Sequence, residues 1–231
     1  MEILKAVLKE GFWPRYCLED VQWQGRKAND FIAFPMVCFC DIPMSRIAEH
    51  VDFYGSFGIG LTKEWGAKNN LNPVIYFTGD NPLHGAIRKL TEVVIGLKEE
   101  EKQAGLKSVR YILAHSKPTK GRMIISGEPL QKDFYQESEW RYVPQNEEID
   151  EYLSFKECQI EERLEESNNK TAKLCKLRFL PSDVKYIFVP SDGEIPAIMN
   201  FIQSELDMYP SADIKLLMSR VTSLESVSLD M

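Results

Sequence analysis

Polar and aromatic residues alternate along residues 134–143 with the two-residue period that is typical of a β-strand. One face of such a strand would carry Phe134, Ser138, Trp140 and Tyr142. The opposite face would carry Tyr135, Glu137, Glu139 and Arg141. The mostly aromatic face suits a core. The charged face forms either a functional site or a solvated sheet surface, and the spacing alone favours the solvated surface.

The same kind of pattern predicts further strands along the chain. Residues 35–40 are apolar on both faces, as in a buried central strand. Residues 54–61 are predicted to form a glycine-rich turn that leads into a strand. The other predicted strands cover residues 72–77, 123–126, 172–179, 184–189 and 214–218.

Helices are predicted where apolar residues recur at helical spacing next to capping residues. The predicted helices are residues 2–10, 63–68 after Thr62, 82–97 after Asn81, a continuation to His115 beyond a break near Gly105, and 194–206, together with a short helix through residues 45–50. Thr62 is expected to cap the second of these, and the Asn81-Pro82 pair to open the third.

The order of these elements predicts an α+β fold, because strands and helices interleave without a regular βαβ period. No repeat or linker divides the sequence, so a single domain is expected over residues 1–231. Residues 146–170 are acidic and poor in aromatic residues, which is typical of an insertion. The resemblance described below implies a split, mostly antiparallel sheet with flanking helices.

Composition narrows the classes of partner. The chain has 28 Lys and Arg against 35 Asp and Glu, a net charge of −7, so nucleic-acid binding is not indicated by charge. Lys117, Lys120 and Arg122 are the nearest approach to a basic patch. No membrane association is expected, because no apolar run is long enough to span a bilayer.

The five cysteines form no zinc-type spacing, which predicts reduced thiols, a cytoplasmic location and no metal. Cys38 and Cys40 are interpreted as packed core residues. Glycines 55, 58 and 60 fit neither a Rossmann fingerprint nor a P-loop. Tight turns with close backbone packing and a ligand role both remain open for these glycines.

Three segments carry a resemblance to a known family: residues 35–43 (PMVCFCDIP), 54–65 (YGSFGIGLTKEW) and 137–141 (ESEWR). In this order they resemble the AbiGi abortive-infection family of bacterial phage-resistance proteins, whose members are labelled antitoxins. More distantly, the layout is similar to ADP-ribosyltransferase-like toxins of the DarT kind. There, a glutamate on a strand faces an NAD cleft built on a split antiparallel sheet.

The distant resemblance implies NAD as cofactor and assigns roles to particular residues. Glu139 would be the catalytic glutamate that stabilises positive charge as the nicotinamide bond breaks. Glu137 would orient or deprotonate the acceptor. Tyr54, Gly55 and Phe57 would line the nicotinamide side, and Arg141 would pair with phosphate or with Glu139.

Two functions remain open at this point. The first is a transferase that modifies a protein or nucleic-acid target of the host or phage. The second is a non-catalytic antitoxin or regulator that binds a partner toxin. Transferases of the DarT kind carry a His or Arg on the first core strand, and by layout that strand would precede the 2–10 helix. His50, His84 and His115 do not match this position, which motivates the second function.

Overall fold

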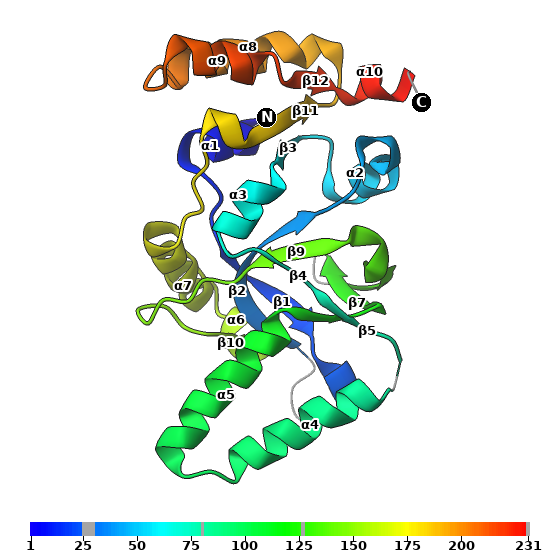
Figure 1. The fold of residues 1–231 in the computed structure, drawn as a ribbon, viewed down its shortest axis with the longest axis vertical. Helices are drawn as coiled ribbons and strands as arrows, with labels where there is room; N and C mark the ends of the chain where they lie inside the picture. The colour runs from blue at the N-terminus through cyan, green and yellow to red at the C-terminus, as the bar shows by residue number, and fades with distance from the viewer. Residues whose placement is uncertain (25–30, 80, 126–127, 230–231) are drawn as a thin grey trace. The chain divides into compact units, whose positions relative to one another are not determined.

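The chain forms two compact units, and each is assembled from segments that are distant in sequence. The computed structural model describes residues 1–24, 31–79, 81–125 and 128–229 (Figure 1). Unit 1 consists of Met1–Trp13, Ile42–Asn70 and Lys176–Met231, and unit 2 consists of Pro14–Asp41 and Leu71–Cys175. The expectation of one domain over residues 1–231 stays a prediction.

Ten α-helices lie within the described residues. They are α1 (Glu2–Glu10), α2 (Ala48–Tyr54), α3 (Lys63–Lys68), α4 (Pro82–Ile95), α5 (Glu99–Ala114), α6 (Phe155–Cys158), α7 (Glu161–Leu174), α8 (Ile195–Glu205), α9 (Ser211–Met218) and α10 (Leu224–Leu229). Short 3₁₀ helices cover Gln22–Gln24, Met44–Arg46, Phe134–Glu137, Pro181–Asp183 and Asp192–Glu194. No helix in this described part of the chain has the length and apolar character needed to cross a membrane.

The strands form several small sheets, so the expected mixture of helices and strands is confirmed. They are β1 (Arg15–Asp20), β2 (Phe31–Cys40), β3 (Gly58–Leu61), β4 (Asn72–Pro73), β5 (Ile75–Phe77), β6 (Ser116–Pro118), β7 (Lys120–Ile125), β8 (Glu128–Asp133), β9 (Glu139–Tyr142), β10 (Leu153–Ser154), β11 (Val184–Val189) and β12 (Val221–Ser223). Among the described strands, only β5–β6 and β11–β12 pair in parallel. All other pairings between them are antiparallel.

Unit 1 is built around an apolar core between the sheet β12-β11-β3 and its helices. The predicted 2–10 helix and 184–189 strand are confirmed as α1 and β11. Leu4 and Leu8, one helical turn apart, face this core from α1. Val184, Ile187 and Val189 face it from β11, and Ile198 and Ile202 from α8.

Close packing accounts for two of the glycines that the sequence singled out. A β-carbon on Gly58 would collide with the Phe188 ring, and one on Gly60 with the Tyr186 ring. Both rings belong to β11, which pairs with β3 in an antiparallel register. Gly55 ends α2 at a φ of 101°, a conformation that side-chain-bearing residues rarely adopt.

Unit 2 contains a five-stranded antiparallel sheet with β2 at its centre, as the apolar pattern of residues 35–40 predicted, but β2 is buried over residues 31–36 and only partly buried over residues 37–40. Ile32, Phe34 and Met36 share one buried cluster with Ala114 at the end of α5. Ala33 and Leu153 belong to another buried cluster, which includes Leu164 of α7. Helices α5 and α7 therefore pack against different sets of β2 side chains.

The acidic segment 146–170 packs as part of unit 2. It supplies β10, which pairs with β2, and most of α7. Leu153 on β10 is fully buried. The side-chain oxygen of Asn168 accepts a hydrogen bond from the Tyr16 N–H at 3.0 Å, so α7 is fixed against the edge strand β1.

Two predicted strands are wrong. Residues 172–174 continue helix α7, and only Leu177 of the predicted 172–179 strand makes a bridge, to Phe12. Residues 214–218 lie in α9, where Ile214 and Leu217 are buried one turn apart. A short apolar run does not distinguish a buried helix from a strand, and here the helical spacing decides.

Helices α4 and α5 form a hairpin in unit 2 (Figure 1). Asn81 caps α4 as predicted, because its side-chain oxygen accepts the Leu83 N–H at 2.9 Å. The predicted break at Gly105 is wrong, because α4 ends at Ile95 and α5 begins at Glu99. Gly105 lies inside α5, where its missing side chain makes room for Val94.

Candidate functional site: a buried ion cluster

The stretch predicted as one strand, residues 134–143, forms a 3₁₀ helix followed by a short strand. Phe134–Glu137 is the 3₁₀ helix, Ser138 has a left-handed backbone (φ 44°), and β9 begins at Glu139. Glu139 is 2% exposed and Arg141 is 0% exposed. The expected solvated charged face is therefore wrong, because these charged side chains point into unit 2 and find partners there.

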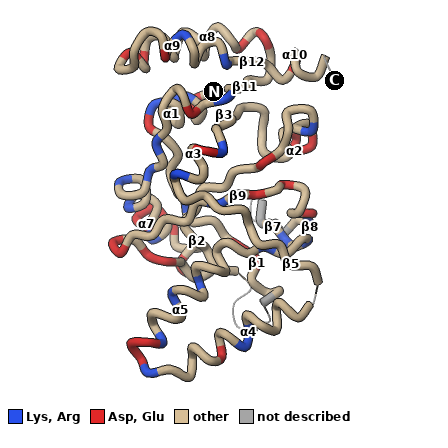
Figure 2. The backbone as a smooth tube through the Cα atoms, in the orientation of Figure 1, with Lys and Arg blue, Asp and Glu red and all other residues tan. Residues whose placement is uncertain are grey.

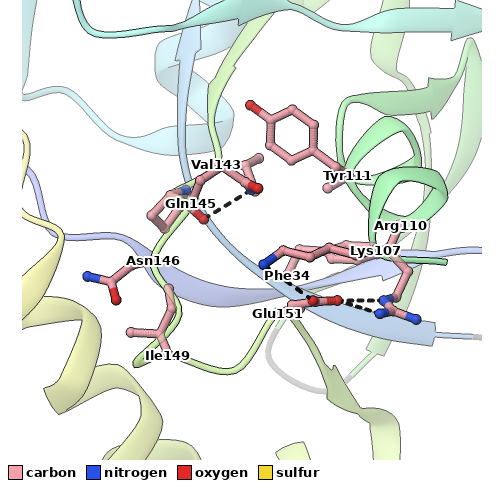
Figure 3. Close-up of a pocket in the computed structure, with 11 residues that line it drawn as sticks. Phe34, Lys107, Arg110, Tyr111, Val143, Gln145, Asn146, Ile149 and Glu151 are labelled. Carbon is pink, nitrogen blue, oxygen red and sulfur yellow. Dashed lines mark hydrogen bonds and ion pairs between the residues drawn. The ribbon is translucent and has the colours of Figure 1, made fainter. Parts of the chain in front are cut away.

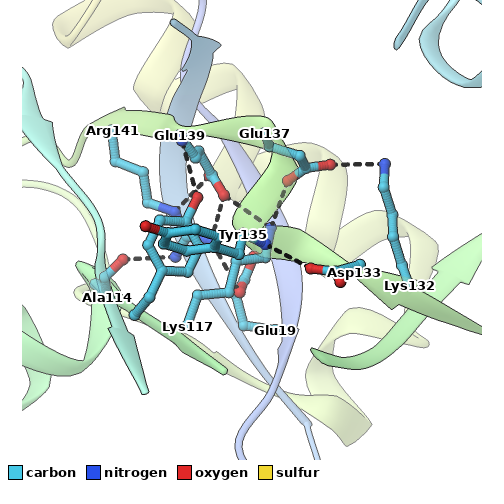
Figure 4. Close-up of polar contacts among 10 residues, drawn as sticks. Glu19, Ala114, Lys117, Lys132, Asp133, Tyr135, Glu137, Glu139 and Arg141 are labelled. Atoms are coloured by element: carbon cyan, nitrogen blue, oxygen red, sulfur yellow. Dashed lines mark hydrogen bonds and ion pairs between the residues drawn. The ribbon is translucent and has the colours of Figure 1, made fainter. Parts of the chain in front are cut away.

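Arg141 lies at the centre of this cluster (Figure 4). Its Nε donates to Oε1 of Glu139 at 2.6 Å, and its Nη2 donates to Oε2 at 3.3 Å. Nη1 donates to the carbonyl of Ala114 at 2.7 Å, and Nη2 lies 3.0 Å from a carboxylate oxygen of Glu19. Each nitrogen of the guanidinium therefore has an acceptor, as a buried arginine requires.

Lys117 on β6 connects the two candidate catalytic carboxylates. Its Nζ donates to Glu139 at 2.8 Å and to Glu137 at 3.3 Å. The same ammonium group lies 4.1 Å from the centre of the Phe134 ring, a cation–π contact. Lys132 on β8 binds the other oxygen of Glu137 at 2.6 Å.

The cluster is balanced in formal charge. It contains three carboxylates and three cations: Glu19, Glu137, Glu139, Lys117, Lys132 and Arg141. Removing charges from water is costly, and a buried cluster persists only when each charge is paired and hydrogen-bonded. This arrangement satisfies that condition.

The pairing also determines how the charged groups titrate. Burial by itself raises the pKa of Glu139, but the charges of Arg141 and Lys117 outweigh it and lower that pKa well below its usual range. Burial lowers the pKa of Lys117, but Glu19 and Glu139 outweigh it and raise that pKa. Both groups are therefore charged near neutral pH.

Neighbouring polar groups complete the surroundings of Glu139. The hydroxyl oxygen of Tyr76 accepts the backbone N–H of Glu139 at 2.9 Å, and burial raises the pKa of Tyr76 to about 12. Cys38 and Cys40 lie opposite Arg141 and Glu139 in the β2–β9 register. Cys38 is exposed and Cys40 is half-buried, so their interpretation as packed core residues is wrong.

The predicted site residues fall into two groups. Glu137, Glu139 and Arg141 are brought together in unit 2. Tyr54 and Gly55 form the end of α2 in unit 1, with Tyr54 44% exposed and its ring 4.6 Å from that of His50. Phe57 packs against the core of unit 1. A role in cofactor binding stays a prediction for all of these residues.

The expected basic patch does not form a cationic surface. Lys117 is buried within the ion cluster. Lys120 lies 3.7 Å from Asp133, and Nε of Arg122 donates to Asp20 at 2.9 Å. Acidic neighbours therefore compensate the residues that were candidates for nucleic-acid contact.

One small pocket in unit 2 lies beside α5 (Figure 3). Its lining includes Phe34, Tyr111 and Ile149, together with Arg110, which pairs with Glu151 at 2.6 Å. The cavity volume is about 30 Å³, room for about two water molecules, so this pocket does not accommodate a dinucleotide. Among the described side chains, no His, Cys, Asp and Glu residues gather in a group that would hold a metal ion.

Sequence reasoning missed half of the cluster. Glu19, Lys117 and Lys132 come from three other strands, and no local pattern marks them. The one available signal was the pair of acidic residues two positions apart, followed by Arg141. That signal identified the charged face of β9 but not whether it is buried or solvated.

Comparison with known proteins gives the family. Residues 10–190 match the family model described as "Putative abortive phage resistance protein AbiGi, antitoxin". The chain is 26% identical over 246 residues to an abortive phage resistance protein AbiGi of Lactococcus lactis subsp. cremoris, covering 95% of this chain and 99% of that protein. No solved structure matches significantly. The AbiGi resemblance is confirmed: the chain belongs to the AbiGi family of abortive phage resistance proteins.

Proposed function

We propose that this protein is the antitoxin of a phage-defence pair and acts by binding and neutralising a partner toxin protein. The family model carries the word antitoxin in its description, which supports a binding role. The ion cluster supports the same interpretation, because each of its charged groups is held in an ion pair with another member of the cluster.

The observation that carries this proposal is the state of Glu139. A catalytic glutamate of a transferase must reach the ribose and stabilise developing positive charge. Here both carboxylate oxygens of Glu139 accept hydrogen bonds from Arg141, Lys117 binds one of them, and the residue is 2% exposed. Freeing it would leave two buried cations with fewer partners, which is costly.

An ADP-ribosyltransferase-like activity with NAD is the second candidate. It is favoured by one observation: Glu137 and Glu139 converge on the same Lys117 ammonium group, as a pair of cooperating carboxylates would. This function requires the ion cluster to open when NAD binds. This candidate function also assumes a split sheet like that of the transferases. It further assumes a protein or nucleic-acid target in the host or phage that receives the ADP-ribose group.

Inhibition of the toxin, measured as a function of the molar ratio of this protein to the toxin, distinguishes the two candidate functions. The activity of the toxin that this proposal assigns as the partner is titrated with the full chain, with and without NAD. An antitoxin that binds its partner neutralises at a one-to-one ratio without NAD. Neutralisation at a much lower ratio that depends on NAD would contradict the proposal and favour the transferase.

Calorimetry with millimolar NAD provides the independent check. The proposal predicts no heat of binding for the wild-type chain. Heat that is lost in Glu139→Gln, but retained in the exposed control Glu147→Gln, would contradict it.

A further inference from the structure

Helix α4 presents an apolar stripe to solvent. Leu83, Ala86, Leu90 and Val93 of α4 follow one another at alternating steps of three and four residues, the spacing of coiled-coil contact positions. The three large residues of this stripe are 46–58% exposed. Ala86 is also exposed. Contiguous apolar patches that are exposed on a soluble protein often mark sites of interaction with other molecules.

The stripe is distinct from the face by which α4 packs within unit 2. Ile87 and Val94 belong to the cluster that joins α4 to α5, together with Val109 and Leu113. At 3.6 residues per turn, Ile87 and Val94 lie at one border of the stripe. Packing against α5 therefore covers only one side of the apolar surface of α4. The rest is available to a second helix over a length of roughly 15 Å, from Leu83 to Val93.

Charge indicates what kind of helix fits. Lys89 lies beside Val93 at the other border of the stripe, and Arg88 follows further around α4. Within Pro82–Ile95 these two cations face a single acid, Glu92, whereas the whole chain has a net charge of −7. Figure 2 shows basic positions on α4 in blue and, in red, the acidic run Glu99–Glu101 that begins α5.

We propose that the α4 stripe docks an amphipathic helix of the partner toxin whose apolar face is bordered by acidic residues opposite Lys89. This inference rests on the proposed antitoxin function. Helix-to-helix docking of this kind uses apolar anchors at successive turns and flanking charges for partner choice. A second copy of this chain is the poorer occupant, because an antiparallel two-fold pairing of α4 would bring Lys89 of both copies to the same border.

Two synthetic peptides test the surface directly. Each has three heptads with leucine at the contact positions; one carries glutamate at the flanking positions and the other carries lysine. Repulsion between like charges keeps each peptide from pairing with itself. Fluorescence anisotropy with the full chain should show the acidic peptide binding about tenfold or more tightly than the basic one. Added salt should reduce this difference.

The matched variants are Leu90→Lys with Val93→Lys on the stripe and Leu216→Lys on α9, an exposed leucine of unit 1. The stripe variant should lose acidic-peptide binding by at least about tenfold, and Leu216→Lys should retain it. Equal binding of both peptides, no binding, or unchanged binding by the stripe variant would overturn the inference. A wild-type dimer that the stripe variant disperses, or binding to anionic vesicles that the stripe variant abolishes, would also overturn it.

The neutralisation assay separates failure of this inference from failure of the proposed function. If the wild type neutralises the toxin and the stripe variant does so equally well, the docking surface is wrong and the antitoxin function stands. If the wild type fails to neutralise, the antitoxin function is wrong, and the peptide result alone decides whether α4 binds acidic helices.

Discussion

The cores of the two units are stabilised in different ways. All of the buried polar and charged side chains found in the described residues belong to unit 2, except Ser223. The core of unit 1 is an apolar cluster that includes Ile187, Ile198 and Ile202, each fully buried. The main sheet of unit 2 instead buries an ion cluster centred on Arg141. An apolar core loses stability in proportion to the volume removed, whereas a buried ion cluster fails when any one partner is lost.

The largest effect is expected from removing the central cation. Arg141→Met should lower the free energy of unfolding of unit 2 by about 3–5 kcal/mol, because Glu139 remains buried, and Glu19 half-buried, with fewer partners. Urea denaturation followed by circular dichroism measures this change. Arg46→Met, at an exposed arginine, should stay within about 0.5 kcal/mol of wild type. Equal stability of Arg141→Met and wild type would remove the distinction between the two cores.

The apolar core of unit 1 should respond in graded steps. Ile198→Ala should cost about 2–5 kcal/mol, and Ile198→Val about 0.5–1.5 kcal/mol. Ile3→Ala, at a residue that is 82% exposed, should have little effect. The same denaturation experiment measures all three variants. A cost of Ile198→Val as large as that of Ile198→Ala would show that this core is not graded.

The ion cluster should make the free energy of unfolding of unit 2 depend on pH. The pKa of Glu139 is lowered in the folded state, so its contribution is present above the unfolded value of 4.5 and is lost as pH falls through the folded pKa. Glu139→Gln should therefore be less stable than wild type at pH 7, by about 1–3 kcal/mol. The difference should shrink as the pH falls below 4.5. Denaturation midpoints across this pH range provide the measurement, and a constant difference would contradict the role of the charge.

The glycines of β3 test close packing in unit 1 without any change of charge. Gly60→Ala should destabilise unit 1 by about 1–3 kcal/mol, because its new methyl group would meet the Tyr186 ring. Gly85→Ala on α4 is the matched control, since its methyl group meets open space and alanine favours the helix by up to about 1 kcal/mol. Thermal unfolding distinguishes the two. If Gly60→Ala were stabilising, the glycine would not be needed for packing.

The elements that the sequence predicted correctly have local signals. Helix α1 has a periodic apolar face, strand β11 is a short run between turns, and Thr62 and Asn81 accept the backbone N–H groups that their types favour. These features depend on residues within a few positions of each other. The family resemblance also depended on short segments that could be read in order.

The candidate site was predicted only in part, for a physical reason. Glu137, Glu139 and Arg141 were identified, but the direction in which they face depends on Glu19, Lys117 and Lys132, which come from distant strands. The two-residue period of a strand determines which side chains share a face. It does not determine which face is buried, because charged side chains can also be buried when partners neutralise them. The wrong assignment of residues 214–218 has a similar origin, because tertiary packing chose between helix and strand.

The most direct test of the central claim is to measure the stability and the toxin neutralisation of Glu139→Gln on the same preparation. If the buried cluster is structural, the variant unfolds at lower urea than wild type, yet its folded fraction still neutralises the toxin at a one-to-one ratio. If the variant keeps wild-type stability and loses neutralisation, Glu139 acts in chemistry or in direct recognition, and the structural account of the cluster is wrong.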